Sequence, residues 1–143
     1  LEIFGLGEFA MQKPSWDEKE GWLREPFLEN ALTSDEVRFN RTYQLLKNNP
    51  ELGVKGITVG WLKQALRRTN EFKSTDWSKA ITRPLLHLNA TEDKLVNNSL
   101  NRELLSQSNL VTIKDIKSQH EIMMESDDVR LIAWQAIDEF LNS

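Results

Sequence analysis

The chain has 143 residues, 39% apolar and 28% charged, and contains no run near the roughly 18 to 20 apolar residues that a membrane-spanning helix needs. Its net charge of -4 and pI near 5.3 argue against a nucleic-acid-binding surface, because phosphate binding depends on clustered positive charge. The absence of cysteine excludes disulfides and thiolate metal sites, and it fits a reducing, cytoplasmic compartment. Two histidines, His87 and His120, do not form a zinc site by themselves.

The first 30 residues carry scattered glycine and proline without a sustained period. This pattern predicts loops and at most short helical turns. The chain does not begin with methionine, and Leu1–Gly7 is expected to continue from a longer protein.

Two helices are predicted next. Thr33 and Glu36 have the spacing of a capping box, which would begin a helix that ends before Pro50. Thr58 is expected to cap the second helix, whose apolar stripe consists of Trp61, Leu62, Ala65, Leu66 and Thr69. With the irregular N-terminal segment, these helices predict a helical cap or lid region over residues 1–80.

Residues 81–143 have the pattern of an α/β core. Pro84 suits the first position of a strand, and Leu85–Leu88 is apolar enough for a buried parallel strand. A helix over residues 97–107 and a strand over Leu110–Ile113 complete a parallel βαβ unit. A last helix is predicted from Ser126, as N-cap, to Leu141, with a buried face of Val129, Ile132, Ala133, Ala136, Ile137 and Phe140.

An acid and a histidine follow the two predicted strands. Asp93 comes after the first strand and His120 after the second, where parallel sheets place catalytic groups. The same order of acid and histidine ends a Ser-Asp-His triad in α/β-hydrolases, although it also arises by chance. His120 is therefore the candidate general base and Asp93 the candidate carboxylate that orients it, with neighbouring Glu92 as an alternative acid.

The other titratable residues nearby are given structural roles. His87, inside the first strand, is expected to be a hydrogen-bonded core or edge histidine. Glu121 and Glu125 are expected to be cap and surface charges on the turn after His120. No serine has glycine two residues before and two residues after it, so the Gly-x-Ser-x-Gly nucleophile motif is absent from the sequence.

Several segments resemble the lysophospholipase L2 and monoacylglycerol-lipase branch of the α/β-hydrolases, over roughly residues 27 to 141. The similar segments are Ile81–Val96 around Asp93, Ile113–Glu125 around His120, Ala136–Leu141 with Arg130 in the last helix, and Asn30–Asp35, Arg38–Phe39, Asn49–Gly53 and Thr58–Leu62 in the cap. The resemblance implies an α/β fold, namely the C-terminal part of an α/β-hydrolase with a helical cap, a two-strand parallel βαβ unit and a C-terminal helix. It also implies Asp93 as triad acid and His120 as triad base.

The resemblance further implies a bacterial serine hydrolase that cleaves a carboxylic ester of a lysophospholipid or monoacylglycerol through an acyl-serine, with no metal or organic cofactor. The nucleophile, the oxyanion-hole loop and the first six strands of that family have no counterpart here, so the chain alone is expected to be inactive. Its expected partners are the missing N-terminal half or further copies of itself, and peripheral contact with the inner membrane is left open. The alternatives are another esterase or peptidase of the same fold, or a non-catalytic interaction domain that kept the fold.

Overall fold

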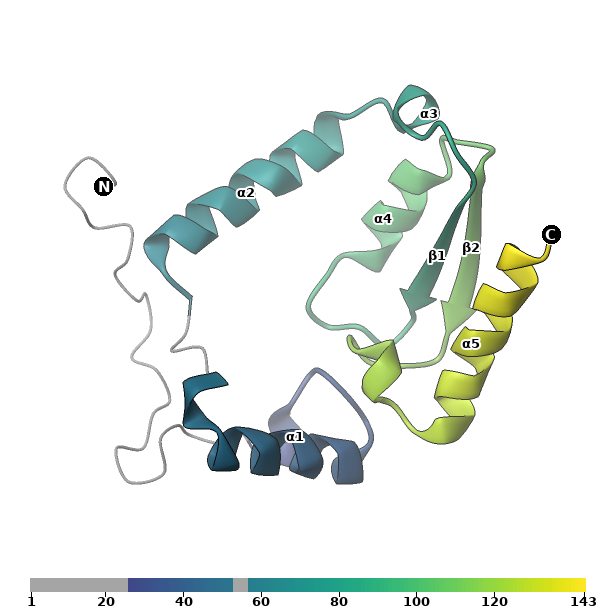
Figure 1. The fold of residues 1–143 in the computed structure, drawn as a ribbon. Helices are drawn as coiled ribbons and strands as arrows, with labels where there is room; N and C mark the ends of the chain where they lie inside the picture. The colour runs from purple at the N-terminus through teal and green to yellow at the C-terminus, as the bar shows by residue number, and fades with distance from the viewer. Residues whose placement is uncertain (1–25, 53–56) are drawn as a thin grey trace. The chain divides into compact units, whose positions relative to one another are not determined.

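The computed structural model describes residues 26–52 and 57–143 (Figure 1). Contacts group them into two compact units, one made of residues 41–52 and 57–75 and the other of residues 26–40 and 76–143. The irregular segment expected at the N-terminus lies mostly outside the described residues. Its described end contains a short 3-10 helix, Phe27–Glu29.

Helix α1, Glu36–Asn48, begins with a different cap from the one expected. Asp35, not Thr33, caps it, because Asp35 Oδ1 accepts a 2.8 Å hydrogen bond from the backbone N–H of Arg38. The Thr33 hydroxyl is occupied elsewhere, since it donates to the carbonyl of Met124 at 2.7 Å. The capping-box prediction was therefore wrong, and Glu36 is the first helical residue instead of the third.

Helix α2, Val59–Ser74, follows the 3-10 helix Pro50–Leu52 along the chain. The Thr58 side chain accepts a hydrogen bond from the backbone N–H of Trp61 at 3.1 Å, which confirms the predicted cap. The helix continues five residues past Thr69, the last residue of the expected stripe, and Arg67 and Arg68 both pair with Glu71 one turn later.

The second unit contains a two-stranded parallel sheet, with β1 at Leu85–Ala90 and β2 at Val111–Ile116. Leu85 lies opposite Val111, and Ala90 lies opposite Ile116. Helix α4, Asn98–Leu105, connects the strands, and the short helix α3, Trp77–Ala80, precedes β1. The predicted parallel strand-helix-strand order is confirmed, with both strands extending a few residues further than expected.

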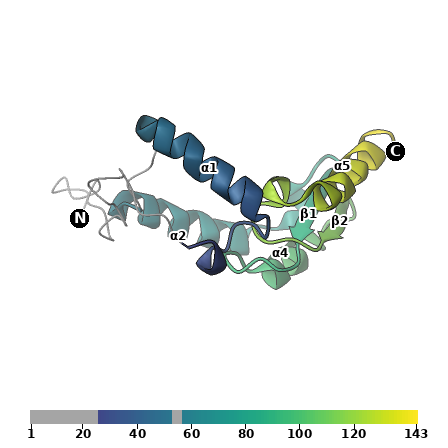
Figure 2. The ribbon, with the colours of Figure 1, turned by 90° about the horizontal axis from the view of Figure 1, so that it is seen from below.

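Two helices cover opposite faces of the sheet, α4 on one side and α5, Asp127–Leu141, on the other (Figures 1 and 2). Helix α5 packs on both strands through Ala133 and Ala136, which are buried. Ile132, expected on the buried face, is 46% exposed. Ser126 occupies the N-cap position of α5 as predicted, but its side chain makes no capping hydrogen bond.

The described residues form a mixed helix and strand structure that is compatible with part of an α/β fold. Its apolar core consists of Ile81, Ala90, Leu104, Leu105, Ile116, Ala133 and Ala136. Within residues 26–52 and 57–143, no helix is long and apolar enough to cross a membrane.

Candidate active site

The loops that follow β1 and β2 run side by side, because backbone pairing continues beyond both strands. The N–H of Thr91 donates to the carbonyl of Ile116 at 2.9 Å, and the N–H of Glu92 donates to the carbonyl of Ser118 at 3.0 Å. This pairing brings the loop that carries Asp93 next to the loop that carries His120.

Asp93 and His120 are in direct contact. Oδ2 of Asp93 lies 2.7 Å from Nδ1 of His120. The other carboxylate oxygen accepts hydrogen bonds from the backbone N–H groups of Leu95, at 2.7 Å, and Val96, at 3.2 Å. The Asp93 side chain is 4% exposed and the His120 side chain 36% exposed, so the acid is enclosed while the imidazole reaches solvent.

The surroundings of Asp93 favour its ionised form. Burial acts to raise the pKa of this carboxyl, but it is outweighed by hydrogen bonds from Leu95, His120 and Val96 and by the charge of a protonated His120. These interactions hold the pKa of Asp93 below its ordinary value. An ionised carboxylate at Nδ1 fixes the imidazole tautomer that keeps its proton on Nδ1, which leaves Nε2 free to accept one.

The alternative acid, Glu92, points elsewhere. Its carboxylate is half-exposed and lies 3.8 Å from the ammonium group of Lys117. Of the two adjacent acids in this loop, the structure brings Asp93 to His120.

His87 is half-buried and lies within β1, before the loop that carries Asp93. Burial lowers its pKa and the charge of Arg102 lowers it further, while the side chain of Asn89 and the charge of Asp115 act to raise it. Its Nε2 has no hydrogen-bond partner within the described part of the chain. His87 therefore lies inside the strand as expected, but the hydrogen bond expected for it is not found at Nε2 among the described residues.

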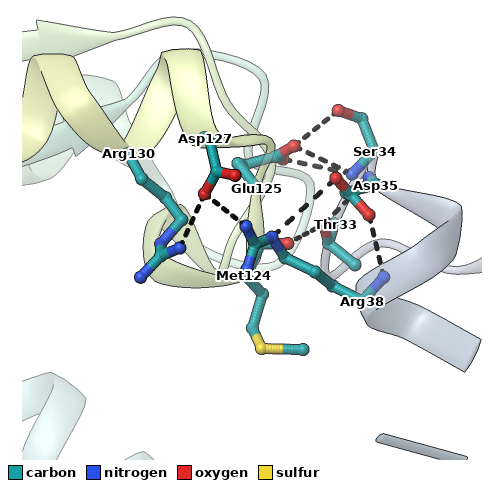
Figure 3. A network of polar contacts seen from close by, with 8 residues as sticks. All are labelled: Thr33, Ser34, Asp35, Arg38, Met124, Glu125, Asp127 and Arg130. Atoms are coloured by element: carbon teal, nitrogen blue, oxygen red, sulfur yellow. Dashed lines mark hydrogen bonds and ion pairs between the residues drawn. The ribbon is translucent and has the colours of Figure 1, made fainter. Parts of the chain in front are cut away.

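Glu125 is fully buried, contrary to the expectation of a surface charge. Its carboxylate accepts a hydrogen bond from the backbone N–H of Gln119 at 2.9 Å. It also accepts one from the hydroxyl of Ser34 at 2.5 Å (Figure 3). The backbone N–H of Ser34 also donates to both carboxylate oxygens. The sequence offered no local signal for this residue, because its main partner lies 91 positions away along the chain. Glu121, by contrast, is exposed as expected.

The segment before α1 supports the histidine loop at further points. The N–H of Glu121 donates to the carbonyl of Leu32 at 2.8 Å, and the N–H of His120 donates to the carbonyl of Ala31 at 3.5 Å. Arg38 donates to the carboxylate of Asp127 at 2.6 Å, which links the first turns of α1 and α5 (Figure 3). Across residues 26–52 and 57–143, no group of three His, Cys, Asp or Glu side chains is arranged to hold a metal ion.

No protein-family model matches the chain. Among curated proteins it is similar to lysophospholipase L2 of Escherichia coli strain K12, with 26% identity over 131 residues, which covers 85% of this chain and 37% of that protein. The lysophospholipase L2 of Escherichia coli O6:H1 matches with the same identity and coverage. The chain thus spans little more than a third of the length of these relatives, and the similarity suggests a distant relationship to lysophospholipase L2.

Proposed function

We propose that this chain is the C-terminal part of a serine ester hydrolase, in which His120 is the general base and Asp93 orients it. The observation that carries the proposal is the 2.7 Å contact between Asp93 Oδ2 and His120 Nδ1 at the carboxyl ends of two parallel strands. A buried carboxylate, an imidazole and a serine hydroxyl in this order form the triad of acyl-transfer hydrolases.

The two residues have complementary roles in that reaction. The Nδ1–H of His120 donates to Asp93, so Nε2 takes the proton of a serine hydroxyl as its oxygen attacks the ester carbonyl. Asp93 stabilises the imidazolium that forms, and His120 then gives the proton to the departing alcohol. Water hydrolyses the acyl-serine in a second step with His120 again as base. The nucleophilic serine is supplied by residues of the complete protein beyond this sequence.

The substrate is proposed to be a lysophospholipid, or else a monoacylglycerol. The name of the two similar Escherichia coli proteins supports the first choice. The proposed division into a helical cap, residues 1–80, and a part of the hydrolase core, residues 81–143, places substrate selection in the cap.

The test uses the complete natural polypeptide with lysophosphatidylcholine, monoacylglycerol and p-nitrophenyl esters as substrates. His120→Ala and Asp93→Asn are each expected to lower kcat by a factor on the order of 10⁴, because proton transfer or its orienting group is lost. Glu92→Gln is the matched control and should keep near-normal activity.

A serine-directed phosphonate should abolish turnover, and the 143-residue chain alone, which lacks the nucleophile motif, should show none. Retention of normal kcat by the His120→Ala variant would refute the proposal. Loss of activity in Glu92→Gln but not in Asp93→Asn would reassign the acid.

A further inference from the structure

The loop that carries His120 is anchored through consecutive backbone N–H groups. The N–H of Gln119 donates to the Glu125 carboxylate, that of His120 to the carbonyl of Ala31, and that of Glu121 to the carbonyl of Leu32. The backbone on both sides of the imidazole is therefore held by groups outside the β2 strand.

The Glu125 carboxylate joins the two segments that flank His120. Oε1 accepts from Gln119 and from the backbone of Ser34, at 2.9 and 3.1 Å, and Oε2 accepts from the Ser34 hydroxyl at 2.5 Å. Ser34 continues the same segment as Ala31 and Leu32, so the Glu125 side chain connects this segment to Gln119, the residue before His120.

Burial of the Glu125 carboxylate costs free energy, and packing alone does not require a carboxylate at this position. A charged group removed from water is unfavourable unless hydrogen bonds replace its hydration, and an apolar side chain could fill the same volume. Both oxygens of Glu125 are matched to donors, and these donors belong to the histidine loop and to the segment that supports it. The arrangement specifies where this loop lies.

We propose that Glu125 is a positioning residue for His120: it holds the histidine loop so that the imidazole contacts Asp93 at Nδ1 while Nε2 faces the nucleophile. This role rests on the proposed hydrolase function. Misplacement of a reacting group by about 1 Å can lower the rate by a factor on the order of 10². The loss should therefore appear in kcat, with KM little changed.

The experiment compares three variants of the complete natural polypeptide. Glu125→Ala removes both acceptors and should lower kcat on the order of 10²-fold, with KM changed by less than about threefold. Glu125→Gln keeps one oxygen as acceptor for Gln119 and Ser34 and presents an amide that can donate to the Ser34 hydroxyl, so it should retain kcat within about fivefold. Glu121→Ala, the exposed glutamate of the same loop, is the matched control and should match the wild type.

A second measurement follows the imidazole directly. With ¹⁵N-labelled histidine, the Nδ1–H proton that bridges to Asp93 gives a downfield NMR resonance that reports this contact without any substrate. The resonance should shift or broaden in Glu125→Ala and stay in place in Glu125→Gln and Glu121→Ala. Unchanged kcat and an unchanged resonance in folded Glu125→Ala would overturn the positioning role, while turnover by the wild type would leave the hydrolase function standing. A different outcome is that the resonance shifts in Glu125→Ala relative to the wild type while neither protein has esterase activity. That result would support the positioning role and refute the hydrolase function.

Ser34→Ala covers the case in which Glu125→Ala does not fold. It removes one donor to the carboxylate and leaves Glu125 in place, so the change is milder. It should move the same resonance and lower kcat in the same direction by a smaller factor. An unchanged kcat and resonance in Ser34→Ala, together with a normal Glu125→Gln, would count against the proposal as fully as the alanine result.

Discussion

Asp93 and Glu92 are adjacent acids, yet only Asp93 reaches His120. The short Asp93 side chain accepts the N–H groups of Leu95 and Val96, which forms a local turn and fixes the carboxylate. The backbone of Glu92 still pairs with Ser118, and its side chain lies beside Lys117 at the surface. A difference of one position therefore separates a buried partner of the histidine from an exposed charge.

The lowered pKa of Asp93 predicts how stability depends on pH. Because the folded-state pKa lies below the ordinary value of 3.8, the ionised carboxyl stabilises the folded protein above that pH, and this stabilisation is lost as the pH falls through the folded-state pKa. Asp93→Asn lacks this contribution, so its free energy of unfolding should fall less steeply than that of the wild type from pH 5 to pH 3. Urea unfolding followed by circular dichroism at several pH values measures the slopes.

Asp138→Asn, at an exposed position of α5, is the control for this experiment and should run parallel to the wild type. A slope for Asp93→Asn equal to that of the wild type would mean that Asp93 gains nothing from its partners on folding.

At the scale of elements, small residues allow α5 to lie close to the sheet. Ala133 is completely buried and Ala136 nearly so, and both lie on the helix face that packs on β1 and β2. The apolar residues Leu131 and Trp134 lie on the exposed side of the same helix. The close approach of helix and sheet therefore depends on side-chain size more than on the number of apolar residues.

Ala133→Leu tests this packing. The added methylene groups have no space under the helix, so the free energy of unfolding should fall by about 1 to 3 kcal/mol. Gln135→Leu adds a similar apolar group at an exposed position and should change stability by no more than about 0.5 kcal/mol. Urea titration of both variants gives the comparison, and equal stabilities would show that α5 does not pack tightly through Ala133.

At the scale of the molecule, the sheet has an unpaired edge. Within the described residues β1 pairs with β2 alone, so its other edge presents backbone N–H and C=O groups without a strand partner. Large apolar side chains are exposed as well, among them Leu131, Trp134 and Leu141 of α5. An open strand edge and apolar surface both favour association with another chain.

The isolated 143-residue chain is therefore expected to form a dimer or higher oligomer, or to bind the N-terminal half of the proposed complete hydrolase when both are mixed. Size exclusion with light scattering across a dilution series measures the mass. A monodisperse species of 16.6 kDa that unfolds cooperatively would contradict this expectation, because it would mean that the chain covers its own sheet.

The sequence by itself was sufficient for the features that depend on local patterns and on the order of the strands along the chain. Thr58 caps α2 because the cap bond spans three residues, and the parallel strands followed from short apolar runs joined by a helix. The meeting of Asp93 and His120 was predictable because the carboxyl ends of adjacent parallel strands share one edge. Only the tertiary structure decided that Thr33 bonds to Met124 and not to its own helix, and that Glu125 is buried against Ser34. The partners of these polar groups lie 91 residues away. No local sequence pattern indicates which distant donor and acceptor will form a buried hydrogen bond.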